Sequence, residues 1–199
     1  MKSIKKSWIV IGVIIVLILI MYSSFKGSYN SMVTMEENVT AQWAQVENVY
    51  QRRADLIPNL VATVQGYADF EKETLQGVIE ARSKATSVTI DPTNMNPATL
   101  QQFQAAQDGL GSALSKLMVV VERYPELKAN QNFMDLQAQL ERTENRIAVE
   151  RRNFNTAAQG FNTYIRQFPK NILASLFGFE KRAYFTAIEG AESAPKVEF

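Results

Sequence analysis

Residues 7–25 read SWIVIGVIIVLILIMYSSF, a run of nineteen residues without a charged side chain. At about 1.5 Å of rise per residue, a helix of this length spans roughly 28 Å, close to the ~30 Å hydrocarbon core of a bilayer. The run therefore predicts a transmembrane helix. A cleaved signal peptide is the alternative, because Lys2, Lys5 and Lys6 supply a basic start. The run is long, however, and no Ala-x-Ala cleavage pattern follows it, so we expect an uncleaved signal-anchor.

The lysines that flank this run predict its orientation. Lys2, Lys5 and Lys6 precede it together with the free amine, whereas Lys26 alone follows it closely. In membrane proteins the excess of Lys and Arg lies on the cytoplasmic side. We therefore predict that residues 1–6 form a basic cytoplasmic N-terminus, that the chain crosses the cell membrane once, and that the rest of it lies outside the cytoplasm.

The composition excludes several kinds of catalytic and binding site. The chain has 21 Lys and Arg against 20 Asp and Glu, a net charge of +1, which argues against a nucleic-acid-binding surface. It contains neither cysteine nor histidine. Disulfides, thiolate metal sites, Ser-His-Asp triads, zinc-binding histidines and Glu-x-x-His di-iron ligands are therefore excluded. We predict no catalytic residue, no metal and no cofactor, and hence a protein that is not an enzyme.

The body of the chain begins with a long amphipathic pattern. Apolar residues recur every three or four positions over residues 29–85, and this stripe, which includes Trp43, Val46 and Tyr67, is expected to face the core. This period predicts one long helix with a heptad-like stripe, as in a coiled coil. Pro58 lies inside the pattern and has no N–H to donate, so we predict a kink at this residue.

Two further long helices and a short one follow. Residues 86–97 collect Ser, Thr, Asn, Asp and Pro, which is typical of a loop. Pro169 suits the start of a helix and Gly178 suits the position just past its end. The pattern predicts helices over residues 98–123, 132–168 and 169–176. The apolar stripes of the two long helices include Leu117, Phe154 and Phe168, which we expect in the core. Gly109 and Gly111 weaken the helix predicted at residues 98–123, and we predict that they mark a close contact with another helix.

These helices predict an all-α protein: an N-terminal transmembrane helix followed by a long antiparallel helical bundle. The predicted domains are a basic N-terminus at 1–6, the transmembrane helix at 7–25, the bundle at 26–186 and a C-terminal tail at 187–199. The last aromatic residues either strap onto the bundle or offer a site for a partner. They are Phe179, Tyr184, Phe185 and Phe199. We expect a strap, because chain ends stay ordered only when tied down.

The densest polar cluster surrounds Pro58. Arg53 and Glu71 fall on the apolar stripe, where an ion is costly unless it is paired, so they are candidates for an internal salt bridge. The alternative is a drifting stripe whose charged side chains reach water. The whole cluster is a candidate interaction site, or a salt-bridge network that shapes the bend. It comprises Gln51, Arg52, Arg53, Asp55, Pro58, Glu71, Glu150 and Arg151.

Two long strings give the chain a family resemblance. YQRRADLIPNLV occupies residues 50–61 and VERRNFNTA occupies residues 149–157. With these strings and its single anchor, the chain resembles the LemA family of bacterial membrane proteins over residues 29–85 and 117–186. The resemblance implies an antiparallel helical bundle carried on one transmembrane helix. It implies no established enzyme activity, and one relative in magnetic bacteria is associated with building membrane compartments.

We predict a membrane-anchored scaffold or adaptor of the bacterial cell envelope that acts through protein–protein interaction. The anchor, the long helices and the lack of catalytic residue types support this function, while the sequence names neither the partners nor the oligomeric state. Two alternatives stay open. The aromatic residues of the stripes would suit a bundle that binds a lipid or a small ligand. Two facing carboxylates would suit a carboxylate-based enzyme.

Overall fold

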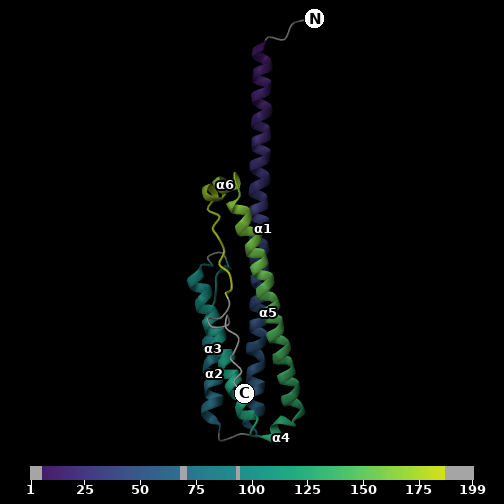
Figure 1. The fold of residues 1–199 in the computed structure, drawn as a ribbon, viewed down its shortest axis with the longest axis vertical. Coiled ribbons are helices and arrows are strands. Elements are labelled where there is room, and N and C mark those ends of the chain that lie inside the picture. Colours follow the sequence, from purple (N-terminus) through teal and green to yellow (C-terminus); the bar gives the residue numbers. More distant parts are fainter. Residues whose placement is uncertain (1–5, 68–70, 93–94, 187–199) are drawn as a thin grey trace, which may run out of the picture. The chain divides into compact units, whose positions relative to one another are not determined.

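The computed structural model describes residues 6–67, 71–92 and 95–186. Within these ranges the chain forms helices and no strand (Figure 1), which confirms the predicted all-α fold. The helices are α1 (Lys6–Gln65), α2 (Lys72–Ser87), α3 (Pro97–Val121), α4 (Pro125–Lys128), α5 (Gln131–Arg166) and α6 (Lys170–Phe177). Residues 1–5 of the predicted basic N-terminus and the whole predicted tail, with Phe199, lie outside the described residues.

The helices belong to two compact units. Unit 1 comprises Met1–Val39 and Ala157–Lys181, and unit 2 comprises Thr40–Thr156 and Arg182–Phe199. Helices α1 and α5 therefore contribute residues to both units. The predicted boundary between the anchor and the bundle falls inside α1, which is continuous there. That boundary stays a prediction.

The apolar run of residues 7–25 lies in the first part of α1. Its large apolar side chains, from Trp8 to Phe25, are all exposed. Among the described residues, α1 is the helix that is long and apolar enough to cross a membrane. A helix that crosses a bilayer satisfies its backbone internally and turns apolar side chains toward lipid, which matches this exposure.

The rest of unit 1 packs through aromatic side chains. Tyr29 of α1 lies edge-on to Phe177 and Phe179, with ring centroids 4.9 and 5.7 Å apart. Phe179 in turn meets the buried ring of Phe161 in α5 at 6.3 Å. Helix α6 ends at Phe177 and is capped by Gly178, whose φ of 75° is in the left-handed region that favours glycine. The short helix predicted before this glycine is therefore confirmed.

The single long helix predicted beyond the anchor is wrong, because the chain turns back partway. Helix α1 runs through Pro58 and ends at Gln65, and α2 begins at Lys72. The turn starts at Gly66 and Tyr67, where glycine has a low helix propensity. Tyr67, a predicted core residue, is exposed. The reversal lets α2 pack its own apolar face against α3.

Unit 2 has one apolar core to which five helices contribute. Ile57 of α1, Val78 of α2, Leu117 of α3, Leu127 of α4 and Phe133 of α5 are all buried in it. Burying a side chain of this size stabilises the fold by about 1.5–3 kcal/mol. The short helix α4 was not expected from the sequence, and Leu127 is the side chain that ties it to this core.

A second part of the core is aromatic and includes the C-terminal segment. The ring of Trp43 lies edge-on to Phe103 and Phe154, at centroid distances of 5.3 and 5.6 Å, and Phe185 stacks on it at 6.0 Å. Asn155 holds the backbone of Phe185: its Nδ2 donates to the carbonyl and its Oδ1 accepts the N–H, each at 2.9 Å. The expected strap is confirmed for Phe185.

Gly109 and Gly111 do not mark a close helix contact, contrary to the prediction. A methyl group built on either α-carbon meets no heavy atom within 4 Å, apart from the adjacent residues and the nearby backbone of α3 itself. Helix α3 packs instead through Leu110, Leu114 and Leu117, which are buried. The two glycines therefore lower the helix propensity of α3 without a packing contact that requires them.

Replacing Gly109 with alanine is expected to raise the free energy of unfolding by about 1 kcal/mol, because the methyl group fits and alanine is the better helix former. Chemical denaturation of the full chain in detergent micelles measures this change. Gly178→Ala serves as the opposite control and should lose about 1 kcal/mol, since its backbone is left-handed. A destabilised Gly109→Ala protein would show that side chains do pack against α3 at this point.

Candidate functional site

The predicted polar cluster divides into a buried and an exposed part because it lies on a helix of 3.6 residues per turn. Arg53 faces the interior of unit 2 with Tyr50 and Ile57, and only 4% of its surface is exposed. Arg52 is exposed on another side of α1, next to the half-buried Leu56. Two adjacent arginines therefore meet different surroundings.

Arg53 joins the helices of unit 2. Its Nη1 donates to Glu144 Oε1 at 2.7 Å, and its Nη2 donates to the Gln107 carbonyl at 3.2 Å and to Gln107 Oε1 at 2.6 Å. The guanidinium also lies over the Tyr50 ring, 5.1 Å from its centroid. Gln107 Nε2 donates in turn to the carbonyl of Ala85, at 3.1 Å. One buried cation thus connects α1, α3 and α5 directly, and α2 through Gln107.

Arg53 and Glu71 are each ion-paired, but with different partners. Glu71 accepts a hydrogen bond from Arg123 Nη2 at 2.8 Å and another from the Tyr124 hydroxyl at 3.1 Å. The partly buried setting of Tyr124, and next its bond to Glu71, raise the pKa of this phenol above its ordinary value. The candidate salt bridge between Arg53 and Glu71 does not form, and each residue pairs with another partner. The two residues are far apart because α1 stays helical for about 18 Å beyond Arg53.

The other members of the cluster are held locally. Gln51 Nε2 donates to Asp55 Oδ1 at 2.7 Å along the surface of α1, where Pro58 is also exposed. On α5 the guanidinium of Arg151 lies 4.7 Å from the centre of the Phe185 ring. The contact with Phe185 gives Arg151 a structural role in holding the C-terminal segment on the bundle. Gln51 and Asp55 remain accessible to solvent.

Arg52 lines a cleft between α1 and α5 in unit 2, with a volume of about 350 Å³. Helix α5 contributes Arg142 and Arg146, which lie one turn apart on one face. Arg146 Nε pairs with Glu150 Oε1 at 2.6 Å. Arg52 and Arg142 form no hydrogen bond or ion pair with any residue that the structure describes. The cleft is lined by Val49, Arg52, Leu56, Gln139, Arg142, Thr143 and Arg146.

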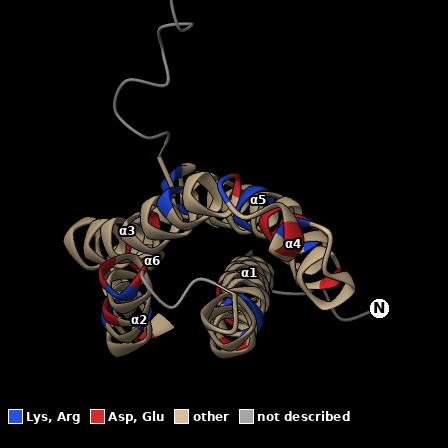
Figure 2. Ribbon diagram, turned by 90° about the horizontal axis from the view of Figure 1, so that it is seen from below, with Lys and Arg blue, Asp and Glu red and all other residues tan. Residues whose placement is uncertain are grey.

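The chemistry of this arginine cleft suits an acidic group. A guanidinium carries five N–H donors in a planar fork and binds a carboxylate or a phosphate through two parallel hydrogen bonds. Val49 and Leu56 add apolar surface beside the three guanidinium groups. Basic and acidic positions are interspersed on α5 as a whole (Figure 2), so the cleft is a local concentration of positive charge rather than part of a basic face.

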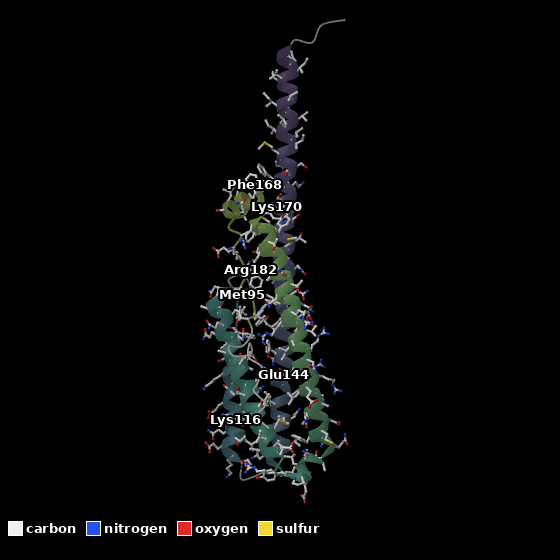
Figure 3. The ribbon with its side chains drawn as sticks, viewed as in Figure 1. Met95, Lys116, Glu144, Phe168, Lys170 and Arg182 are labelled. Carbon is white, nitrogen blue, oxygen red and sulfur yellow. The ribbon has the colours of Figure 1, made fainter. Side chains whose placement is uncertain are left out.

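The acidic side chains are the other candidates for a metal or catalytic site. Within residues 6–67, 71–92 and 95–186, no group of three or more Asp and Glu side chains is placed to hold a metal ion. Glu144, labelled on α5 in Figure 3, bonds to Arg53, and the buried Glu150 bonds to Arg146 and to Asn153 Nδ2. Both carboxylates therefore have cationic partners.

Several residues of the site were missed in the sequence. Arg142 and Arg146 carry a signal that could have found them, because residues four apart share a helix face. The sequence gives no such signal for Gln107 and Asn155, because an uncharged amide in a helix has no feature that indicates a buried hydrogen-bond partner. Their roles depend on which helices lie side by side.

Comparison with known proteins places the chain in a family. It matches the LemA family over residues 42–199, a range that contains the arginine cleft and both strings quoted above. It is 29% identical over 178 residues to magnetosome protein MamQ 2 of Paramagnetospirillum magneticum, covering 79% of this chain and 64% of that protein. It is 27% identical over 170 residues to protein LemA of Metamycoplasma hominis, covering 85% of this chain and 74% of that protein.

A further relative is the magnetosome protein MamQ of Magnetospirillum gryphiswaldense, 28% identical over 176 residues. The chain spans 64% of the length of these magnetosome relatives. Together with the apolar N-terminal part of α1, these matches make the chain a membrane-associated helical protein. It belongs to the LemA family.

Proposed function

We propose that this protein is a non-enzymatic, membrane-anchored scaffold or adaptor that binds acidic segments of partner proteins through the arginine cleft. The observation that carries the proposal is the pair Arg52 and Arg142, two guanidinium groups that line one cleft and have no partner among the described residues. An exposed single ion pair contributes at most about 1 kcal/mol, so affinity would come from several groups acting together.

The contrast with Arg53 supports a binding role for Arg52. Arg53 is buried, and its Nη atoms bond to Glu144 and Gln107, so the fold uses this arginine. Arg52 makes no such contribution, and its side chain lines the same cleft as Arg142 and Arg146. Recognition of acidic motifs by arginine clusters is a recurring mode of protein–protein binding.

The anchor gives this binding a location. Exposed apolar side chains over residues 7–25 fit a single crossing of the cell membrane. The lysines before the run favour a cytoplasmic N-terminus and a bundle outside the cytoplasm in the cell envelope. A partner bound at the cleft would then be confined to the membrane surface. The predicted division into residues 1–6, 7–25, 26–186 and 187–199 belongs to the same proposal.

The ligand-binding alternative rests on the aromatic residues of the stripes. In unit 2 the rings of Trp43, Phe103, Phe154 and Phe185 contact one another. Rings that pack together form core, and aromatic pairs of this geometry contribute about 0.5–1.5 kcal/mol each beyond area burial. This packing favours the scaffold over a bundle that holds a lipid or small molecule between these side chains.

Photo-crosslinking in native membranes tests the scaffold proposal. A benzophenone amino acid replaces Gln139, which lines the cleft and is exposed. We expect a protein adduct that disappears in the Arg52→Glu and Arg142→Glu variants, because a negative charge repels an acidic partner. Arg152→Glu, the same change on an exposed residue of α5 outside the cleft, should leave the adduct unchanged.

Two results would contradict the proposal. An adduct that survives both cleft substitutions would show that the partner does not use the arginines. The absence of any adduct above background, across several growth conditions, would argue against a scaffold that acts through this cleft.

A further inference from the structure

Helix α6 exposes apolar side chains on one face. Leu173 is buried in unit 1, whereas Ile172 and Leu176, one turn apart, expose 59% and 73% of their surface. Phe168, labelled just before the helix in Figure 3, exposes 82%. The sequence pattern predicted Phe168 to be a core residue, so its exposure corrects that prediction. Three large apolar side chains are therefore exposed within residues 168–176.

The place of α6 in unit 1 indicates what covers this face. Phe177, the last residue of α6, packs against Tyr29 of α1 at a centroid distance of 4.9 Å. Tyr29 follows Phe25, the end of the apolar run, by four residues, or about 6 Å along the helix. From Trp8 to Tyr29 the rise is about 31 Å, close to the thickness of a hydrocarbon core. Trp and Tyr concentrate at the two interfaces of a membrane.

The charges around α6 also fit a lipid surface. Helix α6 begins with Lys170 and contains no acidic residue. Arg166 and Lys181 flank it in the chain, Lys26 lies on α1 just past the apolar run, and Glu180 is the nearest acidic residue in sequence. Helices that lie in an interface combine large apolar side chains with Lys and Arg that face the headgroups.

We propose that α6 is an interfacial helix, and that Phe168, Ile172 and Leu176 insert between the headgroups and acyl chains of the bilayer that α1 crosses. This second membrane contact rests on the membrane-anchored part of the proposed function, and it is independent of the arginine cleft. Insertion into the bilayer explains why apolar side chains stay exposed on α6. This helix contacts α1 at Tyr29, four residues past the end of the apolar run.

Site-directed spin labelling tests this proposal, and the absence of native cysteine makes single-cysteine variants clean. The full chain is reconstituted in vesicles of phosphatidylcholine and phosphatidylglycerol, with a nitroxide at Leu176→Cys. Asn171→Cys is the matched control, because it is an exposed polar residue of α6 that lies about 100° around the helix from Ile172 and about 140° from Leu176. Ile15→Cys, inside the apolar run, reports on the anchor.

We expect the label at 176 to be several-fold more accessible to lipid-soluble oxygen than to a water-soluble nickel complex, with the opposite preference at 171. A label at 176 that prefers the nickel complex would overturn the proposal, provided that the label at 15 lies in lipid. A label at 176 shielded from both reagents would also overturn it, because protein rather than lipid would then cover α6. A label at 15 that is open to the nickel complex would instead contradict the anchor itself.

Discussion

Replacing Trp43 with aspartate is expected to abolish the cooperative unfolding transition of unit 2. The indole is 1% exposed and packed against three aromatic rings. Losing it costs about 3–5 kcal/mol, and a buried charge without a partner adds several more. The sum approaches the ~5–15 kcal/mol that stabilises an ordinary domain. Phe154→Asp should have the same outcome, because Phe154 is fully buried beside Trp43.

Thermal unfolding of the full chain in detergent, followed by circular dichroism, measures this effect. Val119→Asp is the matched control: Val119 lies on α3 and is 72% exposed, so its change should stay within about 0.5 kcal/mol. If Trp43→Asp melts like Val119→Asp, the face of α1 that packs into unit 2 has been assigned wrongly.

Truncating Arg53 to alanine is expected to destabilise unit 2 by about 3 kcal/mol, because two buried oxygens of Gln107 would lose their charged donor. Glu144, whose side chain is 49% exposed, would be solvated instead. For a chain of this size the midpoint of thermal unfolding should fall by roughly 6–12 °C. Gln107 would lose two hydrogen bonds and Glu144 its buried partner. The stability of Arg53→Lys should lie between those of the parent and of Arg53→Ala, because lysine keeps the charge without the planar fork.

The adjacent arginine supplies the control for this experiment. Arg52→Ala is expected to change stability by no more than about 0.5 kcal/mol, because Arg52 bonds to no described residue. The two variants should also differ in their effect on binding: Arg52→Ala should impair partner capture while the stability of unit 2 stays unchanged. Equal losses of stability in the two variants would contradict the division of the cluster into a structural and a binding arginine.

Local patterns predicted the helices well. The apolar run and the three- to four-residue stripes depend on neighbours along the chain, and so the helical fold and core residues such as Trp43, Phe154 and Leu117 followed from them. The family match over residues 42–199 likewise confirms a resemblance carried by two contiguous strings.

The tertiary pairings could not be predicted in this way. Arg53 and Glu144 are 91 positions apart, and their pairing depends on α1 lying beside α5. The turn after Gln65 was missed because the apolar period continues across it. The exposure of Phe168 was missed for a related reason: an apolar position in a helix has the same sequence pattern whether protein or lipid covers it.

The candidate site was found only in part. Arg52 belonged to the predicted cluster, but the cleft also needs Arg142 and Arg146 from a helix about ninety positions later in the chain. Glu71, Arg151 and Arg53 proved to hold the fold together, because each is bonded within unit 2. In this chain a charged residue on an apolar stripe, such as Arg53, indicates an ion that stabilises the fold. Its exposed neighbour, Arg52, is the candidate for binding.

Both proposals require that residues 7–25 remain in the mature chain as its membrane anchor. The most direct test is the mass of the protein recovered from cell membranes after an alkaline carbonate wash, which removes peripheral proteins. We predict that the protein stays with the washed membranes and that its mass includes residues 7–25. A chain that starts beyond Phe25 and is released by the wash would contradict the anchor, and with it the placement of the arginine cleft and of α6 at a membrane surface.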